Sequence, residues 1–272
     1  MTFEYRQTLL KASGVSLALG KNVILRDLDL EIRDCYRPGC ITGQIVGLLG
    51  PSGIGKTRLF RILSGIDKPD TGSVLIGEKG VPVERGMVGV VAQNYPLFEH
   101  RTVAGNLELA ARAAGLDRAA ASEKAASFLK RFGLEDRADL YPCQLSGGQR
   151  QRVAIAQQFL CSEHFVLMDE PFSGLDLIAV EQVCKMIAEV ANSDELNTMI
   201  VVTHDIPAAV TVADTIWLLG RDRDEHGKII PGAKLKKSYN LAEMGLAWRE
   251  GISETREFME VVHEIRAAFP SL

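Results

Sequence analysis

The sequence predicts an α/β fold with a mainly parallel sheet, an antiparallel β layer at the N-terminus and an inserted helical subdomain. Short apolar runs, such as residues 165–168 and 199–202, alternate with longer segments of helical periodicity. This alternation is typical of a parallel sheet covered by helices on both faces. Residues 8–33 instead alternate apolar and polar side chains, and residues 102–141 are rich in alanine with helical spacing. These two segments predict the antiparallel layer and the helical insertion.

The N-terminal layer is expected to be a hairpin that leads into a buried strand. Runs 15–19 and 28–32 predict two strands, and residues 20–22, which begin with a glycine, predict the turn between them. Residues 34–43 hold one proline and two glycines and predict a loop. The apolar run 45–49 then predicts a short buried strand.

The stretch after this strand matches the phosphate-binding pattern G-x-x-x-x-G-K-[ST], with the residues Gly50-Pro51-Ser52-Gly53-Ile54-Gly55-Lys56-Thr57. Residues 56–64 predict a helix that Gly65 ends. A strand that leads through a glycine loop into a helix directs backbone N–H groups and the positive helix end at one point. Lys56 suits the terminal phosphates of a nucleotide, and the Thr57 hydroxyl suits Mg²⁺. The loop by itself is compatible with a kinase, a GTPase or an ATPase.

The later elements follow from the same patterns. Strands are predicted at 73–76, 87–92, 165–168, 199–202 and 215–219, and helices at 145–162 and 177–190. Tyr95-Pro96-Leu97-Phe98 predicts a partly exposed apolar loop. The tail 221–272 is more polar, and its apolar residues form one helical stripe, namely Phe258, Val261, Val262, Ile265 and Phe269. We interpret this stripe as a helix docked on the body, in preference to a partner-binding helix.

Polar residues follow several of the predicted strands, where open α/β sheets present their ligands. Asp169 and Glu170 end one strand; Asp169 suits Mg²⁺, and Glu170 suits a general base for water. The alternative is an acidic pair that caps the segment before Pro171. His204 ends another strand and beside a nucleotide would contact the γ-phosphate, although most single histidines are structural. Gln93 has an amide that can bridge magnesium and water.

A second glycine-rich helix start lies at Ser146-Gly147-Gly148-Gln149. Its N–H groups and the Ser146 hydroxyl predict another anion site. The predicted helical insertion separates it from the phosphate loop, so the two sites need not serve the same nucleotide from one copy of the chain.

Composition narrows the class of protein. The 272 residues are 46% apolar and 24% charged, with a net charge of −4, which is typical of a globular protein and gives no basic field for nucleic acid. The apolar runs are too short for a membrane span, and the N-terminus has no signal-peptide pattern. Five scattered cysteines indicate reduced thiols, as in the cytosol.

With these motifs in order, the sequence resembles the ATP-binding subunits of ABC transporters over about residues 8–220. The matching segments are the phosphate loop 50–57, Gln93 of the Q-loop, the signature 145–149, the strand 165–170, the D-loop 173–176 and His204 of the switch. The resemblance implies a P-loop NTPase core in an ABC ATPase domain, residues 1–220, with a helical subdomain at about 98–162 and a C-terminal tail, residues 221–272.

The resemblance also implies a mechanism and partners. Two subunits face head to tail, and each ATP lies between the phosphate loop of one and residues 146–149 of the other. Glu170 polarises water, His204 holds the γ-phosphate and Asp176 couples the two sites. Asp169, Thr57 and Gln93 are implied as magnesium ligands. A permease is expected to dock near Gln93 and Tyr95-Pro96-Leu97-Phe98, which implies a peripheral subunit on the cytoplasmic face of the cell membrane.

The sequence departs from the family at the adenine end. An aromatic residue usually precedes the glycine of the first turn, and here Leu19 stands there. Stacking from this position is therefore lost or replaced by van der Waals contact, with Tyr5 or Tyr36 as candidates to help. The segment before the signature, residues 139–144, resembles importers, and residues 213–217 and 241–248 loosely resemble the nitrate/sulfonate/taurine group.

Three other readings stay open at this point. They are the ATPase of an ABC exporter, a soluble ABC ATPase acting on DNA or ribosomes, and another phosphate-loop enzyme such as a small-molecule kinase. The absence of a long coiled-coil insertion, zinc fingers or a second cassette disfavours the soluble class, and the signature disfavours the kinase. An importer could also work with a substrate-binding protein.

Overall fold

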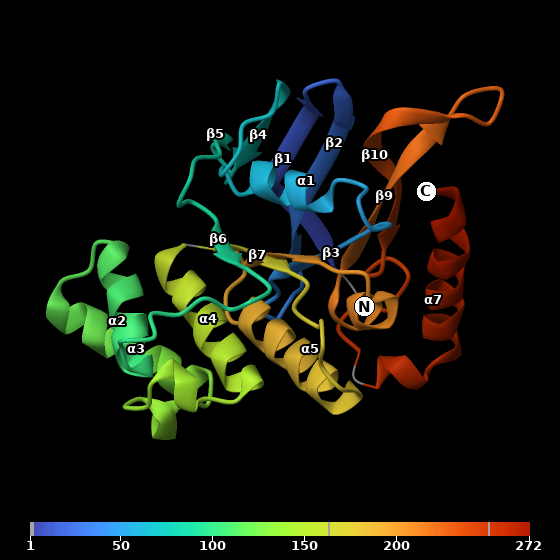
Figure 1. Cartoon of the computed structure of the whole chain (residues 1–272). Coiled ribbons are helices and arrows are strands. Elements are labelled where there is room, and N and C mark those ends of the chain that lie inside the picture. Colours follow the sequence, from blue (N-terminus) through green and yellow to red (C-terminus); the bar gives the residue numbers. More distant parts are fainter. Residues whose placement is uncertain (1–2, 163, 250) are drawn as a thin grey trace.

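The computed structural model describes residues 3–162, 164–249 and 251–272. Within them, ten strands form one sheet. The strands are β1 (Glu4–Leu19), β2 (Asn22–Tyr36), β3 (Gln44–Leu49), β4 (Thr71–Ile76), β5 (Val81–Pro82), β6 (Gly89–Val91), β7 (Phe165–Asp169), β8 (Thr198–Val202), β9 (Thr215–Arg223) and β10 (Ile229–Asn240). Their spatial order is β5-β4-β1-β2-β10-β9-β3-β8-β7-β6 (Figure 1).

The described helices connect or cover these strands. The α-helices are α1 (Lys56–Leu63), α2 (Val103–Ala113), α3 (Arg118–Arg131), α4 (Gly147–Cys161), α5 (Leu177–Ala191), α6 (Ile206–Val212) and α7 (Arg256–Ala268). Short 3₁₀ turns lie at Glu135–Arg137, Pro142–Gln144, Ile252–Glu254 and Phe269–Ser271. The α/β fold class predicted from the sequence is confirmed.

The sheet has an antiparallel half and a parallel half. Strands β5, β4, β1 and β2 pair antiparallel, whereas β9, β3, β8, β7 and β6 pair parallel in that order. The halves meet where β10 pairs parallel with β2 at Ala233 and Leu25 and antiparallel with β9. The carboxyl ends of β3, β7 and β8 therefore lie side by side, and each is followed by a segment of the predicted site.

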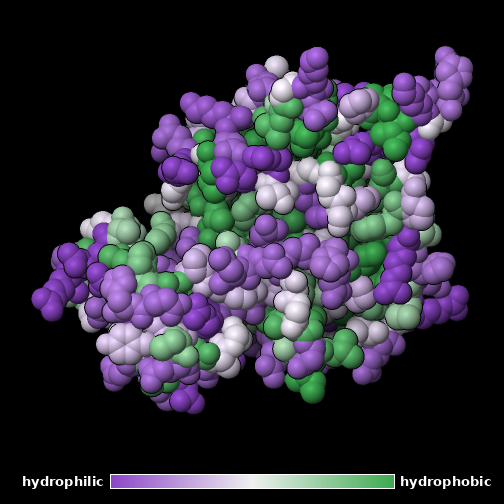
Figure 2. Space-filling view, viewed as in Figure 1, coloured by the Kyte–Doolittle hydropathy of each residue, from purple (hydrophilic) through white to green (hydrophobic). Residues whose placement is uncertain are grey.

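Apolar side chains are strongly exposed at the start of α5. Figure 2 shows a largely hydrophilic face over α2 and α3, with hydrophobic surface at the lower edge where α5 begins. Leu177 and Ile178, the first residues of α5, are 85% and 70% exposed. No helix among residues 3–162, 164–249 and 251–272 is long and apolar enough to cross a bilayer.

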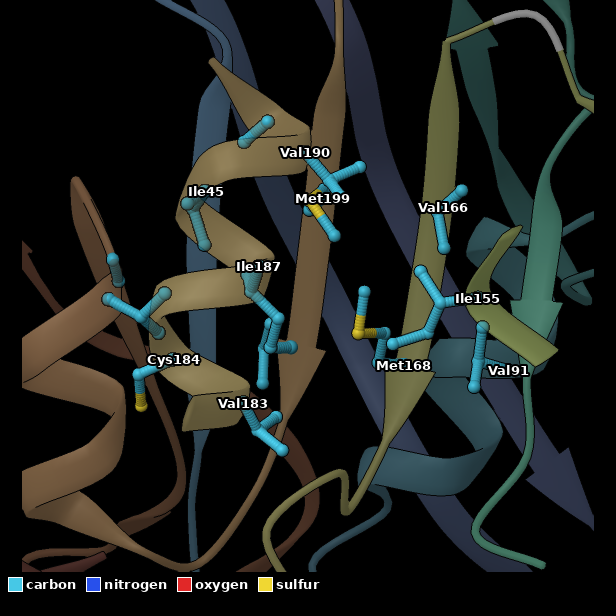
Figure 3. Close-up of a cluster of buried hydrophobic side chains, with 14 of the residues drawn as sticks. Ile45, Val91, Ile155, Val166, Met168, Val183, Cys184, Ile187, Val190 and Met199 are labelled. Atoms are coloured by element: carbon cyan, nitrogen blue, oxygen red, sulfur yellow. The ribbon is translucent and has the colours of Figure 1, made fainter. Parts of the chain in front are cut away.

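The two faces of the parallel strands carry different cores. On β3, Ile45 and Leu49 belong to a cluster that includes helices α2 to α7, whereas Val46 and Leu48 belong to a cluster with α1 and the antiparallel strands. Figure 3 shows the first cluster, in which Ile187 of α5 faces the sheet near Met199 and Met168. Because neighbouring strand residues point to opposite faces, α1 and α4 lie on opposite sides of the sheet.

The helical insertion forms as expected and has identifiable ends. Thr102 caps α2 by accepting the Gly105 N–H at 3.0 Å, and Asp117 caps α3 by accepting the Ala120 N–H at 2.9 Å. Gly115 and Gly133 follow these helices with φ of 95° and 62°, a left-handed conformation that glycine adopts without steric cost. In α4, residues 153–157 are buried without interruption, so this helix has core on several sides.

Some elements differ from the prediction. β2 extends to Tyr36 into the expected loop, the strand expected at 87–92 shortens to Gly89–Val91, and β5 was not predicted. The sheet also continues past residue 220, where the sequence suggested that the ATPase domain ends. Strand β9 runs through that position, and β10, which the polar tail did not suggest, lies between β9 and β2.

The predicted C-terminal helix is present as α7 and is docked. Phe258, Val261, Val262 and Ile265 are buried in the cluster that contains α5 and α6. The interpretation of the apolar stripe as a packing face is confirmed.

A side chain of α4 accepts a hydrogen bond from the backbone of the edge strand β6. The Val90 N–H donates to Gln158 Oε1 of α4 at 3.0 Å. An added Cβ at Gly89 would lie 3.0 Å from the Gln158 Cβ and 3.1 Å from its carbonyl oxygen. Helix α4 therefore packs directly against the sheet edge and not only against other helices.

Candidate nucleotide site at the carboxyl ends of the parallel strands

The phosphate loop forms an open helix start. Gly55 is the N-cap of α1 with φ of 115°, and none of the described side chains caps the helix. An added Cβ at Gly55 would lie 3.0 Å from Ile24, so the position needs glycine both for its dihedral and for space. Lys56 Nζ donates to the Gly50 carbonyl at 2.7 Å and to the Pro51 carbonyl at 3.2 Å. The lysine thus folds back over the loop, and burial lowers its pKa.

Asp169 and Glu170 lie at the end of β7, as predicted. Asp169 is opposite Val202 of β8. Its pKa is raised, first by burial and then by the nearby Glu170 carboxylate, while Lys56 acts in the opposite sense. These charge effects show that Asp169, Glu170 and Lys56 share one electrostatic environment.

Glu170 is held by its backbone and by its side chain. Its φ is 52°, a left-handed conformation that is uncommon outside glycine, and its N–H donates to the Val202 carbonyl at 2.8 Å. Its Oε2 lies 2.8 Å from His204 Nδ1 and accepts from Thr203 Oγ1 at 3.3 Å. The Glu170 side chain is 19% exposed and that of His204 is 67% exposed, so Glu170 is sheltered beneath an accessible imidazole.

Gln93 also reaches this group. Its Nε2 donates to Ser173 Oγ at 3.2 Å, and the Ser173 N–H donates to the Glu170 carbonyl at 3.2 Å. The residues predicted on strands β6, β7 and β8 therefore lie in one connected patch. The magnesium role predicted for Gln93 stays a prediction, because the contact observed here is to serine.

The loop after Gln93 is partly exposed, as its sequence predicted. Phe98 is 44% exposed, but Tyr95 is half-buried, and burial raises the pKa of its hydroxyl to about 12. The Tyr95 hydroxyl donates to the Pro171 carbonyl at 3.1 Å, and Gln151 Nε2 of α4 donates to the same oxygen at 2.9 Å. Sequence reasoning missed this convergence, since a backbone carbonyl as acceptor leaves no sequence signal.

The signature forms a closed helix start. The Gln149 N–H donates to Ser146 Oγ at 3.3 Å, and the Ser146 N–H donates to Gln149 Oε1 at 3.0 Å. This reciprocal pair is a capping box. Gly147 lies beside it on the surface. Since α1 and α4 lie on opposite sides of the sheet, the phosphate loop and the signature do not form one site within a single chain.

Asp176 lies at the start of α5, where it accepts the Ala179 N–H at 2.8 Å. The strongly exposed Leu177 and Ile178 follow it. Its local role in this structure is that of a helix cap.

The structure rules out the suggestion that Tyr5 or Tyr36 helps Leu19 to hold adenine. Leu19 is 44% exposed at the end of the hairpin, opposite Asn22, while Tyr5 pairs with Cys35 and Tyr36 with Glu4 at the other end. Ile24, which follows the turn, is the residue next to Gly55. Tyr5 and Tyr36 are therefore too far along the strands to help Leu19 hold the base.

This geometry defines a phosphate-loop ATPase: an uncapped glycine helix start, with an acidic pair and a histidine at the ends of adjacent parallel strands. The chain belongs to the ATP-binding subunits of ABC transporters. The family model described as "ABC transporter" matches residues 39–173.

Relatives support the family assignment. The chain is 37% identical over 220 residues to a Chlorella vulgaris protein named "Probable sulfate/thiosulfate import ATP-binding protein CysA", which covers 80% of this chain and 87% of that protein. It is 36% identical over 220 residues to the L-cystine import ATP-binding protein TcyC of Bacillus subtilis, with 76% and 85% covered. Some curated relatives are longer, and the chain spans 54% of their length.

Among solved structures, the chain resembles a dimeric ATP-binding cassette, MJ0796, in a post-hydrolysis state with ADP and phosphate. The TM-score is 0.66 and the identity 26%, and the match covers 86% of this chain and 99% of that one.

Proposed function

We propose that this chain hydrolyses ATP as one of two cassettes that close on each other and thereby drive an importer. The observation that carries the proposal is the Glu170–His204 contact of 2.8 Å at the end of β7, beside the open helix start at Gly55. A sheltered carboxylate next to a phosphate site is suited to take a proton from water. A small-molecule kinase would leave the signature without a use.

The phosphate loop would bind the β- and γ-phosphates of ATP. Gly50 to Gly55 supply backbone N–H groups, and Lys56 exchanges its two carbonyl contacts for phosphate oxygens. Thr57 and Asp169 offer hard oxygen donors for Mg²⁺, with Gln93 as a further donor. No cluster of three or more His, Cys, Asp or Glu with metal-binding geometry occurs among the described residues. This donor set fits Mg²⁺, which in such sites binds one or two protein oxygens together with phosphate, and the ion would neutralise charge on the phosphates.

Glu170 would act as general base and His204 as the γ-phosphate contact. The two already touch, so His204 can orient the carboxylate and then turn its exposed ring toward the phosphate. Thr203 holds the same Glu170 oxygen at 3.3 Å and keeps the carboxylate in place during that movement. The proton of the attacking water goes to the other, free side of the carboxylate.

The second copy would supply the signature. Ser146, Gly147, Gly148 and Gln149 lie on the opposite side of the sheet from the phosphate loop of the same chain, so the lid must come from another chain. A dimeric, post-hydrolysis cassette among the similar structures supports this arrangement. Asp176 and the exposed Leu177 and Ile178 would lie at the same interface, where Asp176 couples the two sites. An identical copy is the simplest partner.

The permease would dock on the helical side, near Gln93 and the loop from Tyr95 to Phe98. This places the chain at the cytoplasmic face of the cell membrane as a peripheral subunit. Import is supported by relatives described as import ATP-binding proteins, and a substrate-binding protein would then deliver the cargo. The finer hypothesis of nitrate, sulfonate or taurine transport rests on residues 213–217 and 241–248.

Glu170→Gln tests the base. We expect turnover to fall by at least about 1000-fold, because the amide cannot accept the proton, while ATP binding is retained. Size-exclusion chromatography with ATP and Mg²⁺ should then show a dimer that persists. Glu181→Gln, on the exposed side of α5, is the matched control and should keep both turnover and elution unchanged. Near wild-type hydrolysis by Glu170→Gln would show that another group is the base.

A further inference from the structure

The carbonyl oxygen of Pro171 joins three parts of the molecule. It accepts from the Tyr95 hydroxyl at 3.1 Å and from Gln151 Nε2 at 2.9 Å. Tyr95 belongs to the loop after Gln93, Gln151 belongs to α4 two residues beyond the signature, and Pro171 directly follows Glu170. One backbone atom next to the proposed base is thus held by both the Q-loop and the helical insertion.

Each of the two donors, Tyr95 and Gln151, carries a feature that destabilises the fold locally. Tyr95 has a φ of 45°, which is disfavoured for a residue with a Cβ. Gln151 is 1% exposed, and its Oε1 has no hydrogen-bond partner in the described structure. A buried unpaired amide oxygen is destabilising, and an apolar residue of similar size would avoid it. Packing alone therefore gives no reason for a glutamine here.

The position of Pro171 bears directly on Glu170. Glu170 is left-handed at φ of 52°, and its own N–H is fixed to β8 through the Val202 carbonyl. Among the described residues, the backbone after Glu170 is held by the Ser173 N–H, which donates to the Glu170 carbonyl at 3.2 Å, and by the two hydrogen bonds to the Pro171 carbonyl. A shift of the Pro171 peptide therefore rotates the Glu170 backbone and displaces its carboxylate relative to His204.

We propose that Tyr95 and Gln151 are positioning residues for the base: they hold the Pro171 carbonyl so that Glu170 is aligned for hydrolysis. This inference rests on the proposed function, because it takes Glu170 as the base. It also makes the helical insertion a control element, since a rotation of α4 pulls Gln151 away from Pro171 and lowers turnover without touching ATP.

Gln151→Glu gives the decisive test. A protonated carboxyl can donate to the Pro171 oxygen as the amide does, whereas a carboxylate repels it. Burial raises the pKa of a carboxyl at such a site. We expect kcat to fall roughly 10-fold relative to wild type at about pH 8 and to recover to within roughly 2-fold at about pH 6. The KM for ATP should stay unchanged, because no nucleotide contact is altered.

The neighbouring charges do not explain such a recovery. The Tyr95 hydroxyl, whose pKa is about 12, stays protonated over this range, and Arg152, which is next in α4, is present in both proteins. Glu170, Asp169, Lys56 and His204 are present in both proteins. The ratio of variant to wild-type kcat therefore isolates the introduced carboxyl. A ratio that is the same at both pH values, in protein shown to be folded by circular dichroism, would overturn the proposal.

Tyr95→Phe keeps the proposal testable if Gln151→Glu does not fold. It removes one hydroxyl and should lower kcat roughly 3- to 10-fold with KM unchanged. Tyr36→Phe, at the far end of the hairpin, is the control and should leave kcat unchanged. Tyr95→Phe combined with Gln151→Leu should cost less than the sum of the single changes, because both act on one oxygen. Unchanged kcat in Tyr95→Phe, or strict additivity, would contradict the proposal.

The Glu170→Gln and Gln151→Glu variants together distinguish a wrong base from a wrong positioning role. If Glu170→Gln keeps turnover, the assignment of the base fails. If Glu170→Gln is inactive but the pH ratio of Gln151→Glu is flat, the base stands and only the positioning role fails.

Discussion

The chain contains two glycine-rich helix starts that look alike in sequence and differ in structure. At α1 the N-cap is Gly55, left-handed and without a side-chain cap. At α4 the N-cap is Ser146, which forms a reciprocal capping box with Gln149. The first start leaves its N–H groups without a side-chain acceptor, while the second already satisfies one of them within the chain.

This difference suits the two glycine-rich helix starts to different uses. An uncapped start is stabilised by an anion that binds to it, so the phosphate loop is completed by its ligand. A capped start is stable by itself and exposed, so it can serve as a preformed surface for the nucleotide of another subunit. The opposite positions of α1 and α4 on the sheet agree with this division of labour.

Of the variants that compare the two helix starts, Lys56→Ala should lower activity most, because it removes the cation at the uncapped start. We expect kcat/KM for ATP to fall about 100- to 1000-fold, and the increase in Tm on addition of ATP should disappear. Arg150→Ala is the counterpart at the capped start, where Arg150 pairs with Glu99 at 2.6 Å. It should keep the increase in Tm, since a single chain binds ATP through α1. An equal loss in both variants would mean that the two starts serve one site.

Ser146→Arg should be next in size and should affect only the two-chain step. A large cation at the exposed cap blocks closure, so turnover should fall roughly 100-fold while the ATP-induced increase in Tm remains. Ser146→Ala controls for the lost cap, which should cost about 1 kcal/mol of unfolding free energy in a urea titration. Full turnover in Ser146→Arg would argue against a lid from a second chain.

Replacing a glycine by alanine should give the smallest effects. The free energy of unfolding should fall at the first helix start and rise at the second. Gly55→Ala places a Cβ at φ of 115° and 3.0 Å from Ile24, and we expect a loss of about 2 kcal/mol in unfolding free energy. Gly148→Ala meets nothing within 4 Å and has no positive φ. Because it lies in a helix, it should gain about 0.5 kcal/mol. Urea titrations of both variants check this, and matching signs would remove the distinction between the starts.

The fold class and the places of the site motifs at the strand ends could be predicted from the sequence. Gly55, Lys56, Glu170 and His204 belong to short motifs whose chemistry is read from adjacent residues, and the apolar strands fix where those motifs lie. The contact of Tyr95 with Gln151 through a carbonyl could not be predicted, because any residue supplies that oxygen.

The limits of prediction in the tail have a similar physical cause. Strand β10 contains Lys234, Lys236 and Lys237 and has only a few buried side chains, such as Ala233 and Tyr239. Strand β10 forms through backbone hydrogen bonds to β9 and has no apolar run of its own. Sequence periodicity therefore gave no sign of the strand that joins the two halves of the sheet.

The contact between Gln158 and strand β6 has a consequence for solubility. An edge strand with free N–H groups can recruit a strand from another molecule and start aggregation. Here the Val90 N–H is occupied by Gln158 Oε1 at 3.0 Å, and α4 covers the strand. Helix α4, which begins at the signature, thus also blocks this N–H at the β6 edge of the sheet from pairing with a strand of another molecule.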